Sequence, residues 1–253
     1  AQYSYAFSKW SVANNATITG ATTITATFTQ TVRTYTVTIA VNNSNYGSVD
    51  ITSVANVPYG TKLSASSNVL TVLSDKKVTA TAKTLAGYNT VFSSWTNGTA
   101  TVQGNLTVTA NFTRTAISYT ISYDLKGGTV ATANPTTYTI ETATFILHNP
   151  TKTGYTFAGW TGTGLSSATK TVSIAKGSTG NRSYTATWTP NTNTAYKVEH
   201  YQEGLDGKYV LKDTDNLTGT TDTTANATAK SYPGFTYSPS VSGTVASGTI
   251  AAN

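Results

Sequence analysis

Apolar and polar residues alternate along several stretches of the chain. Over residues 34–39, tyrosine, valine and isoleucine alternate with threonine, and residues 106–113 and 184–189 repeat the scheme. A period of two places successive side chains on opposite faces of a strand, so these stretches predict half-buried β-strands. No comparable stretch has a helical period. The chain is therefore predicted to be all-β.

Turn residues separate the strand patterns, as at Gly127-Gly128, Asn149-Pro150 and Pro233-Gly234. Two connections, from Arg114 to Ser118 and from Pro190 to Thr194, are short and polar, and we place module boundaries there. Short linkers restrict the relative motion of neighbouring modules. We therefore expect small β-modules in tandem, arranged as an elongated rod.

A phenylalanine followed three residues later by a tryptophan occurs three times, each time ahead of alternating threonines. The pairs are Phe7/Trp10, Phe92/Trp95 and Phe157/Trp160. A large aromatic pair that recurs in one setting indicates that a small β-unit is repeated along the chain.

The first two pairs align without a gap at an offset of about 85 positions, so that Tyr3 falls on Tyr88 and Phe7 on Phe92. On this alignment residue 1 falls in the middle of a module. The first segment is thus expected to lack the N-terminal strands of its module and to present unpaired strand edges, which favour self-association.

The Phe-x-x-Trp spacing predicts a β-bulge. Positions three apart on a regular strand face opposite sides, so both rings enter one core only if the strand bulges between them. In the third copy, Ala158-Gly159 suits such a bulge because glycine accepts unusual dihedral angles. We assign seven aromatic residues to the module cores: Phe7, Trp10, Phe92, Trp95, Phe157, Trp160 and Trp188. The alternative is that exposed pairs stack on sugar rings.

The composition fits exposed β-surface. Only 10% of the residues are charged, and 56 threonines carry most of the polarity. Cysteine and methionine are absent, which excludes disulfides and thiolate metal sites. No apolar run is long enough to span a membrane, and the first residues do not form a signal peptide. An export signal and a wall anchor are expected outside this sequence.

The net charge of +6 is unevenly distributed. Residues 1–190 hold twelve Lys or Arg against four acids, and residues 191–253 hold four against six. The basic part favours acidic polymers by long-range attraction, although the scattered lysines equally fit an ordinary solvated surface. No nucleic-acid-binding motif accompanies the charge, so no nucleic-acid partner is predicted.

No catalytic, cofactor-binding or metal-binding residues are predicted. Neither His148 nor His200 belongs to a triad or a metal motif. Asp213 and Asp215 suggest either a calcium site or a solvated acidic edge, and their spacing fits no EF-hand loop. For a self-formed Lys–Asn or Thr–Gln crosslink, which needs a buried acid beside the reacting pair, the plausible helpers are Glu141 and Glu199. No local signature supports either of them.

One stretch resembles a known family. Residues 119–129, followed by Pro150 to Thr153, then Gly154 to Trp160 and a closing strand from Tyr184 to Trp188, resemble the Listeria–Bacteroides repeat, the internalin B type of B-repeat. Residues 35–113 look like a divergent form of the same repeat. Residues 1–29 look like the end of another copy.

The last part resembles a second family. The run Tyr196 to Glu203, with Gly219 to Asp222 and Tyr232 to Phe235, is similar to mucin-binding-protein-like repeats of Gram-positive surface proteins. The two resemblances imply β-grasp-like modules in a long surface protein, an adhesin or its stalk. They also give the expected division: residues 1–33 as the C-terminal part of a truncated divergent B-repeat, 34–115 as a divergent B-repeat, 116–190 as a B-repeat, and 191–253 as a mucin-binding-like β-module, truncated at its C-terminus.

These observations predict a non-enzymatic repeat segment of an extracellular, wall-attached protein that projects an adhesive domain from the cell. A rival hypothesis makes the modules themselves the binders of host or cell-wall glycans, acidic polymers or surface proteins. Under that hypothesis the contacts come from exposed tyrosines such as Tyr46, Tyr59 and Tyr209 together with scattered lysines. An enzyme is the third and least favoured class.

Overall fold

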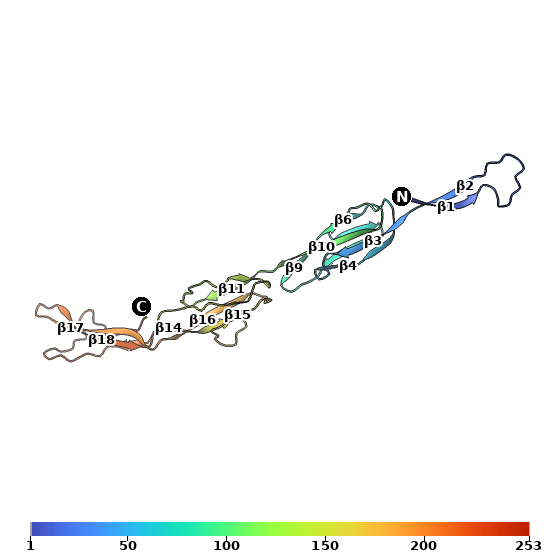
Figure 1. The fold of residues 1–253 in the computed structure, drawn as a ribbon. Helices are drawn as coiled ribbons and strands as arrows, with labels where there is room; N and C mark the ends of the chain where they lie inside the picture. Colours follow the sequence, from blue (N-terminus) through green and yellow to red (C-terminus); the bar gives the residue numbers. More distant parts are fainter. Residues whose placement is uncertain (1, 253) are drawn as a thin grey trace. The chain divides into compact units, whose positions relative to one another are not determined.

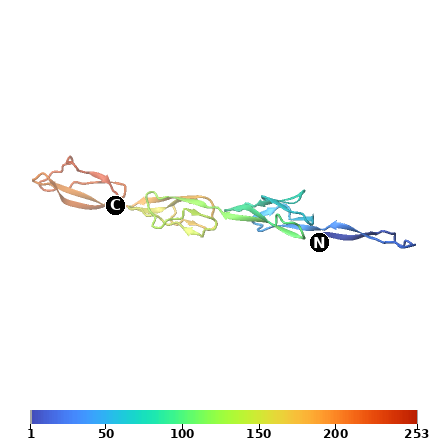
Figure 2. The ribbon, with the colours of Figure 1, turned by 90° about the horizontal axis from the view of Figure 1, so that it is seen from above.

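The computed structural model describes residues 2–252, and within this range it contains strands, turns and loops but no helix. The all-β prediction is confirmed. The chain divides into two compact units, Ala1–Ile117 and Ser118–Asn253, and the division falls within the predicted connection from Arg114 to Ser118. Figure 1 labels several strands of each unit, and Figure 2 shows the same ribbon from above.

The first unit begins with an isolated hairpin. Strand β1 (Tyr3–Trp10) pairs antiparallel with β2 (Ala26–Val32), and no other strand of the described residues joins this sheet. Most of its side chains are exposed.

The rest of the first unit is a module of two sheets. Its strands are β3 (Thr34–Val41), β4 (Gly47–Val49), β5 (Ser53–Pro58), β6 (Ser64–Ser66), β7 (Val69–Leu73), β8 (Lys76–Ala82), β9 (Tyr88–Thr96) and β10 (Leu106–Ala116). One sheet has the order β5-β3-β10-β9 and the other β4-β8-β7-β6. At the centre of the first sheet, β3 and β10 run parallel although they lie far apart in the sequence.

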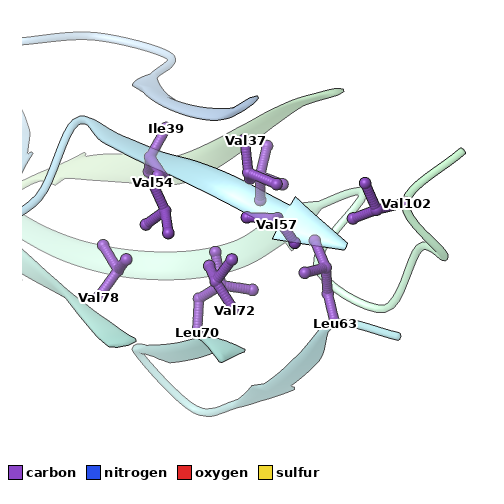
Figure 3. Packing of buried hydrophobic residues seen from close by; sticks show 10 residues of the cluster. Val37, Ile39, Val54, Val57, Leu63, Leu70, Val72, Val78 and Val102 are labelled. Carbon is purple, nitrogen blue, oxygen red and sulfur yellow. The ribbon is translucent and has the colours of Figure 1, made fainter. Parts of the chain in front are cut away.

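The core of this module lies between the two sheets. Side chains such as Val37, Val54 and Val57 point toward Leu70 and Val78 of the opposite sheet (Figure 3). The alternation explains this packing, because the aliphatic side of β3 faces inward while its threonines face outward.

The second unit contains a module with the same arrangement of its main sheet. Its strands are β11 (Tyr119–Asp124), β12 (Thr137–Tyr138), β13 (Phe145–Ile146), β14 (Tyr155–Gly162), β15 (Ser173–Ile174) and β16 (Arg182–Pro190). The order is β12-β11-β16-β14, and the first strand again runs parallel to the last. Trp160 is fully buried at the centre of its core, where its indole N–H donates to Asn149 Oδ1 at 3.0 Å.

The remainder of the second unit is built from two hairpin-like sheets. Strand β17 (Thr194–Glu203) pairs with β18 (Tyr209–Gly219), and β19 (Thr224–Asn226) pairs with β20 (Ser247–Thr249). Burial is sparse here, and Ile250, which packs beside Gly219, is the buried aliphatic residue of this segment among the described residues.

The predicted β-bulge is confirmed in all three copies. The pairing register shifts between Phe7 and Lys9, between Phe92 and Ser94, and between Phe157 and Gly159. In each copy the residue between those two positions has no partner on the opposite strand. The bulge therefore turns the phenylalanine and the tryptophan to the same face of the sheet.

The seven assigned aromatic residues differ in burial. Trp160 is buried, while Phe92, Trp95, Phe157 and Trp188 are partly buried and pack against the cores of their modules. Phe7 and Trp10 require a correction, because they are 51% and 48% exposed. The hairpin β1–β2 has no second sheet against which these rings can pack.

Gly159 follows the bulge of the third copy and lies against a neighbouring segment. Its φ is +148°, and a Cβ at this position would lie 2.6 Å from the backbone nitrogen of Thr169. Trp160 and Thr169 exchange two backbone hydrogen bonds of 2.9 Å there. In the first two copies Lys9 and Ser94 occupy the equivalent position, so the bulge itself does not require glycine.

We predict that Gly159→Ala destabilises the β11–β16 module by about 2 kcal/mol or more. The cost of the strained dihedral angles adds to the cost of the clash with the Thr169 backbone. Gly164→Ala is the matched control, since Gly164 also has a positive φ of +74° but no atom within 4 Å of the added Cβ. Urea unfolding followed by tryptophan fluorescence measures both. Equal losses for the two variants would contradict the close approach at Gly159.

Candidate functional site

The three tyrosines proposed as surface contacts have different surroundings. Tyr46 is partly buried beneath the Arg114 guanidinium, whose Cζ lies 5.2 Å from its ring centroid and 4.2 Å from that of Tyr88. Tyr59 packs 6.5 Å from Tyr35, centroid to centroid.

Tyr209, in the second unit, is 46% exposed and stands at the start of β18. Each of the three tyrosines thus belongs to a different local environment. Tyr209 has the most exposed side chain of the three, whereas the face of the Tyr46 ring is covered by the Arg114 guanidinium.

Shallow hollows occur in both units. One, of about 430 Å³, lies in the first unit over the ends of β8 and β9; the other, of about 360 Å³, lies in the second unit near residues 191–195. The first is lined by Ser67, Asn68, Ala80, Thr81, Ala82, Thr90, Val91 and Phe92, and the second by Gly154, Asn191, Asn193, Thr194, Ala195, Ala251 and Ala252. Both linings present hydroxyl and amide groups rather than ionisable ones.

A charged cluster lies on the β17–β18 hairpin. Lys230 Nζ donates to Asp213 Oδ2 at 2.6 Å and to Asp215 Oδ1 at 2.5 Å. His200 Nε2 lies 3.1 Å from the other oxygen of Asp215, and the His200 ring packs edge-on against Tyr232. The pair of aspartates therefore forms ion pairs with a lysine, and no group of three or more potential metal ligands occurs among residues 2–252.

These ion pairs shift the pKa values of their members. The hydrogen bond from Lys230 holds the pKa of Asp213 and that of Asp215 below the ordinary aspartate range. The hydrogen bonds to Asp213 and Asp215 raise the pKa of Lys230 in turn. Sequence reasoning found the two aspartates but not Lys230, which lies 15 residues beyond Asp215 and carries no local signal.

A second cluster joins the module of residues 116–190 to the segment that follows it. The Thr221 hydroxyl, which is buried, donates to the Gly154 carbonyl at 2.9 Å. The Thr194 hydroxyl then donates to Thr221 Oγ1, with 2.6 Å between the oxygens. Asn191 bridges the same groups, because its N–H donates to Gly154 O and its carbonyl accepts from the Thr221 N–H.

Further contacts close this junction, which we define as Gly154, Tyr155, Asn191, Thr194, Thr221 and Asp222. The Tyr155 hydroxyl donates to the Asp222 carboxylate, and this hydrogen bond raises the pKa of Tyr155. A Cβ at Gly154 would lie 2.3 Å from that of Ala252, so the position has no room for a side chain. The junction couples the two segments of the second unit through polar groups, of which the Thr194 and Thr221 hydroxyls are withdrawn from water.

We predict that Thr221→Val loosens the junction. Valine keeps the shape of threonine but removes the hydroxyl that donates to Gly154 O and accepts from Thr194, at an expected loss of about 1–3 kcal/mol. Thr218→Val, at an exposed position of β18, is the control. Hydrogen exchange of the Asn191 and Thr221 amides should accelerate only in the first variant, and equal rates in both variants would contradict the assignment.

We also predict that the charged cluster makes the β17–β18 hairpin sensitive to acid. Because the pKa values of Asp213 and Asp215 are lowered, their stabilisation is present above the unfolded value of about 3.9 and is lost as the pH falls through the folded values. The contribution of Lys230, whose pKa is raised, is present below its unfolded value of about 10.4 and is lost only at higher pH. The protection factors of amides in β17 and β18, taken relative to the intrinsic exchange rate at each pH, should therefore decrease as the pH falls below about 4.

Lys230→Met should remove most of this dependence, whereas Lys212→Met, at an exposed position of β18, should retain it. Salt at about 1 M should weaken the difference, because the groups are open to solvent. An unchanged acid response in Lys230→Met would contradict the role of the cluster.

The comparisons with known proteins concern one module. Residues 119–186 match the model of the Listeria-Bacteroides repeat domain. No curated protein and no solved structure matches the chain. Among the described residues no helix is long and apolar enough to cross a membrane. The matched stretch runs from the start of β11 into β16, so this part of the chain is similar to a repeat that is typical of surface proteins.

Proposed function

We propose that this chain is a non-enzymatic repeat segment of a bacterial cell-surface protein and that it spaces an adhesive part of that protein away from the cell wall. The observation that carries the proposal is the match of residues 119–186 to a repeat of surface proteins. The remaining support comes from how the modules are built and connected.

Separate cores support a spacing role. The mainly aliphatic core of residues 34–115 and the aromatic-rich core of residues 116–190 are distinct clusters. Each is built from the strands of its own module. The same strand order occurs in both, which supports the interpretation of residues 34–115 as a divergent copy of the matched repeat. Modules that each fold around their own core can be added in series without changing their neighbours.

The connections also support a spacing role. One residue separates β2 from β3, two separate β10 from β11, and three separate β16 from β17. Connections this short limit the freedom of successive modules, and at the last of them the junction adds buried hydrogen bonds. A spacer needs such restricted joints, because freely jointed modules would coil back on themselves.

The surroundings of the two histidines fit structural roles. His148 exchanges backbone hydrogen bonds with the Asn134 side chain, at 2.7 and 2.9 Å, and this pairing fixes the turn before Pro150. His200 is a member of the charged cluster and contacts Asp215.

A second candidate function is binding of an acidic polymer or a glycan by the modules themselves. The excess of twelve basic over four acidic residues in positions 1–190 favours it, together with exposed tyrosines such as Tyr209. Attraction of this kind is long-ranged and weakens as salt rises.

We predict that small-angle scattering from the chain gives a radius of gyration well above the value of about 18 Å expected for a compact domain of this length. The physical reason is that modules with separate cores and short connections occupy successive positions. A value near that of a compact globule would contradict the spacing role.

A heparin column and a glycan array separate the two candidates. A spacer passes through heparin at low salt, whereas salt-sensitive retention or a reproducible glycan signal supports binding by the modules.

A further inference from the structure

The hairpin β1–β2 repeats the geometry of the last hairpin in the complete module, β9–β10. The Phe7 and Trp10 rings lie 5.3 Å apart at 52°, and the Phe92 and Trp95 rings lie 5.5 Å apart at the same angle. The cross-strand pairs agree as well. Phe7 meets Phe28 edge-on at 6.0 Å, and Phe92 meets Phe112 edge-on at 5.8 Å. The two hairpins are therefore structurally equivalent.

Their burial differs. At an offset of 84 positions, Ile18, Ile24 and Phe28 correspond to Val102, Val108 and Phe112. The three residues of the complete module are 0%, 0% and 1% exposed, whereas those of the first hairpin are 48%, 49% and 57% exposed. The first hairpin thus carries the apolar residues of a core that is not assembled around it.

The edge that would complete this core can be identified from strand lengths. Strand β10 begins at Leu106, and its first five residues pair in parallel with Val37–Val41 of β3. The equivalent strand β2 begins four residues later in its own copy, at Ala26, and residues 21–25 carry no strand. The missing part of β2 is the part that in β10 contacts the parallel strand.

The third module uses the same edge in the same way. Residues Arg182–Thr185 of β16, which precede Ala186 as Leu106–Thr109 precede Ala110, pair in parallel with Ile121–Asp124 of β11. In both complete modules the partner is a strand from the start of a repeat with large apolar residues at alternate positions: Val37, Ile39 and Val41 in one, and Ile121 and Tyr123 in the other. Strands β3 and β11 therefore both show which residue pattern such a partner strand carries.

We propose that residues 18–28 form an acceptor edge for a parallel β-strand of the Tyr35–Val41 kind, supplied by another repeat of this type. In the register of the complete module, Thr22 lies opposite the position of Val37, Ile24 opposite that of Ile39, and Ala26 opposite that of Val41. The rest of the donor repeat, equivalent to β4–β8, then covers the rings of Phe7, Trp10 and Phe28 as it covers Phe92, Trp95 and Phe112.

A second copy of this chain is a poor donor. Its strands of the required pattern, β3 and β11, are already paired within their own modules and contribute to the cores there. Donating either strand would expose a complete core in order to cover an incomplete one. The acceptor edge therefore favours an unpaired strand over self-association.

The test extends the full chain with a copy of residues 34–85 joined directly ahead of residue 1. We expect the amides of residues 18–28 to exchange at least about tenfold more slowly than in the parent chain, because they gain a parallel partner. A control extension carries threonine in place of Val37, Ile39 and Val41, and should leave exchange unchanged. In the extended chain Ile24→Asp should abolish the protection, whereas in the parent chain it should have little effect, because Ile24 is exposed there.

A second design removes the dependence on folding of the added segment. Residues 1–32 replace residues 86–116 inside the native second module, where β3 already stands in place. The chimeric module should unfold cooperatively. The fluorescence of the transplanted Trp10 should have its maximum at a shorter wavelength than in the parent hairpin, because the indole becomes buried.

Three results would overturn the proposal. The first is unchanged exchange of residues 18–28 in the extended chain together with an exposed tryptophan in the exchanged module. The second is equal protection by the control extension. The third is association of the parent chain into dimers that Ile24→Asp disperses, since that would assign the face to a second copy.

Discussion

The parallel pairing of the first strand of a module with its last strand is the constraint on which the rest of the structure depends. In the second segment β3 pairs with β10, and in the third β11 pairs with β16. This pairing joins residues 69 positions apart in the first case and 61 in the second, and it brings the bulged hairpin, with its Phe-x-x-Trp pair, against the rest of the module. Closing so long a loop costs conformational entropy, and the buried aliphatic and aromatic residues offset that cost. Where the pairing is absent, as at β1–β2, the same rings remain exposed.

The polar clusters of the described residues lie at a joint between segments and on a hairpin. The buried hydroxyls of Thr194 and Thr221 lie at one joint, and the ion pairs of Lys230 stabilise the neighbouring hairpin. The match of residues 119–186 to a surface-protein repeat agrees with this organisation. The proposed spacing role follows from the joints, while the proposed acceptor edge follows from the exposed apolar residues of the β1–β2 hairpin.

Much of the fold could be predicted from the sequence because it depends on local patterns. Alternation of threonine with aliphatic residues identifies strands such as Thr34–Val41, and the spacing of Phe157 and Trp160 identifies a bulge. The burial of Phe7 and Trp10 was predicted wrongly. A pattern shows which face of a strand is apolar, but it does not show whether another layer covers that face.

Contacts between residues far apart in the sequence could not be predicted. Lys230 reaches Asp213 and Asp215 only because the segment after β19 returns to the hairpin, and Arg114 lies over Tyr46 only because β10 and the residues before β4 are brought together. Neither pairing has a local motif. The junction at Thr221 is hidden for the same reason, since one threonine among 56 carries no signal of burial.

Native-state hydrogen exchange on the unmodified chain tests the central constraint most directly. Amides in the parallel-paired parts of β10 and β16 should exchange only when their whole module unfolds, and the two modules should open with separate free energies. The amides of β1 and β2 should exchange much faster despite the near-identical ring geometry of that hairpin. Equal protection of β1–β2 and β9–β10 would contradict the claim that pairing of the first and last strands closes each module.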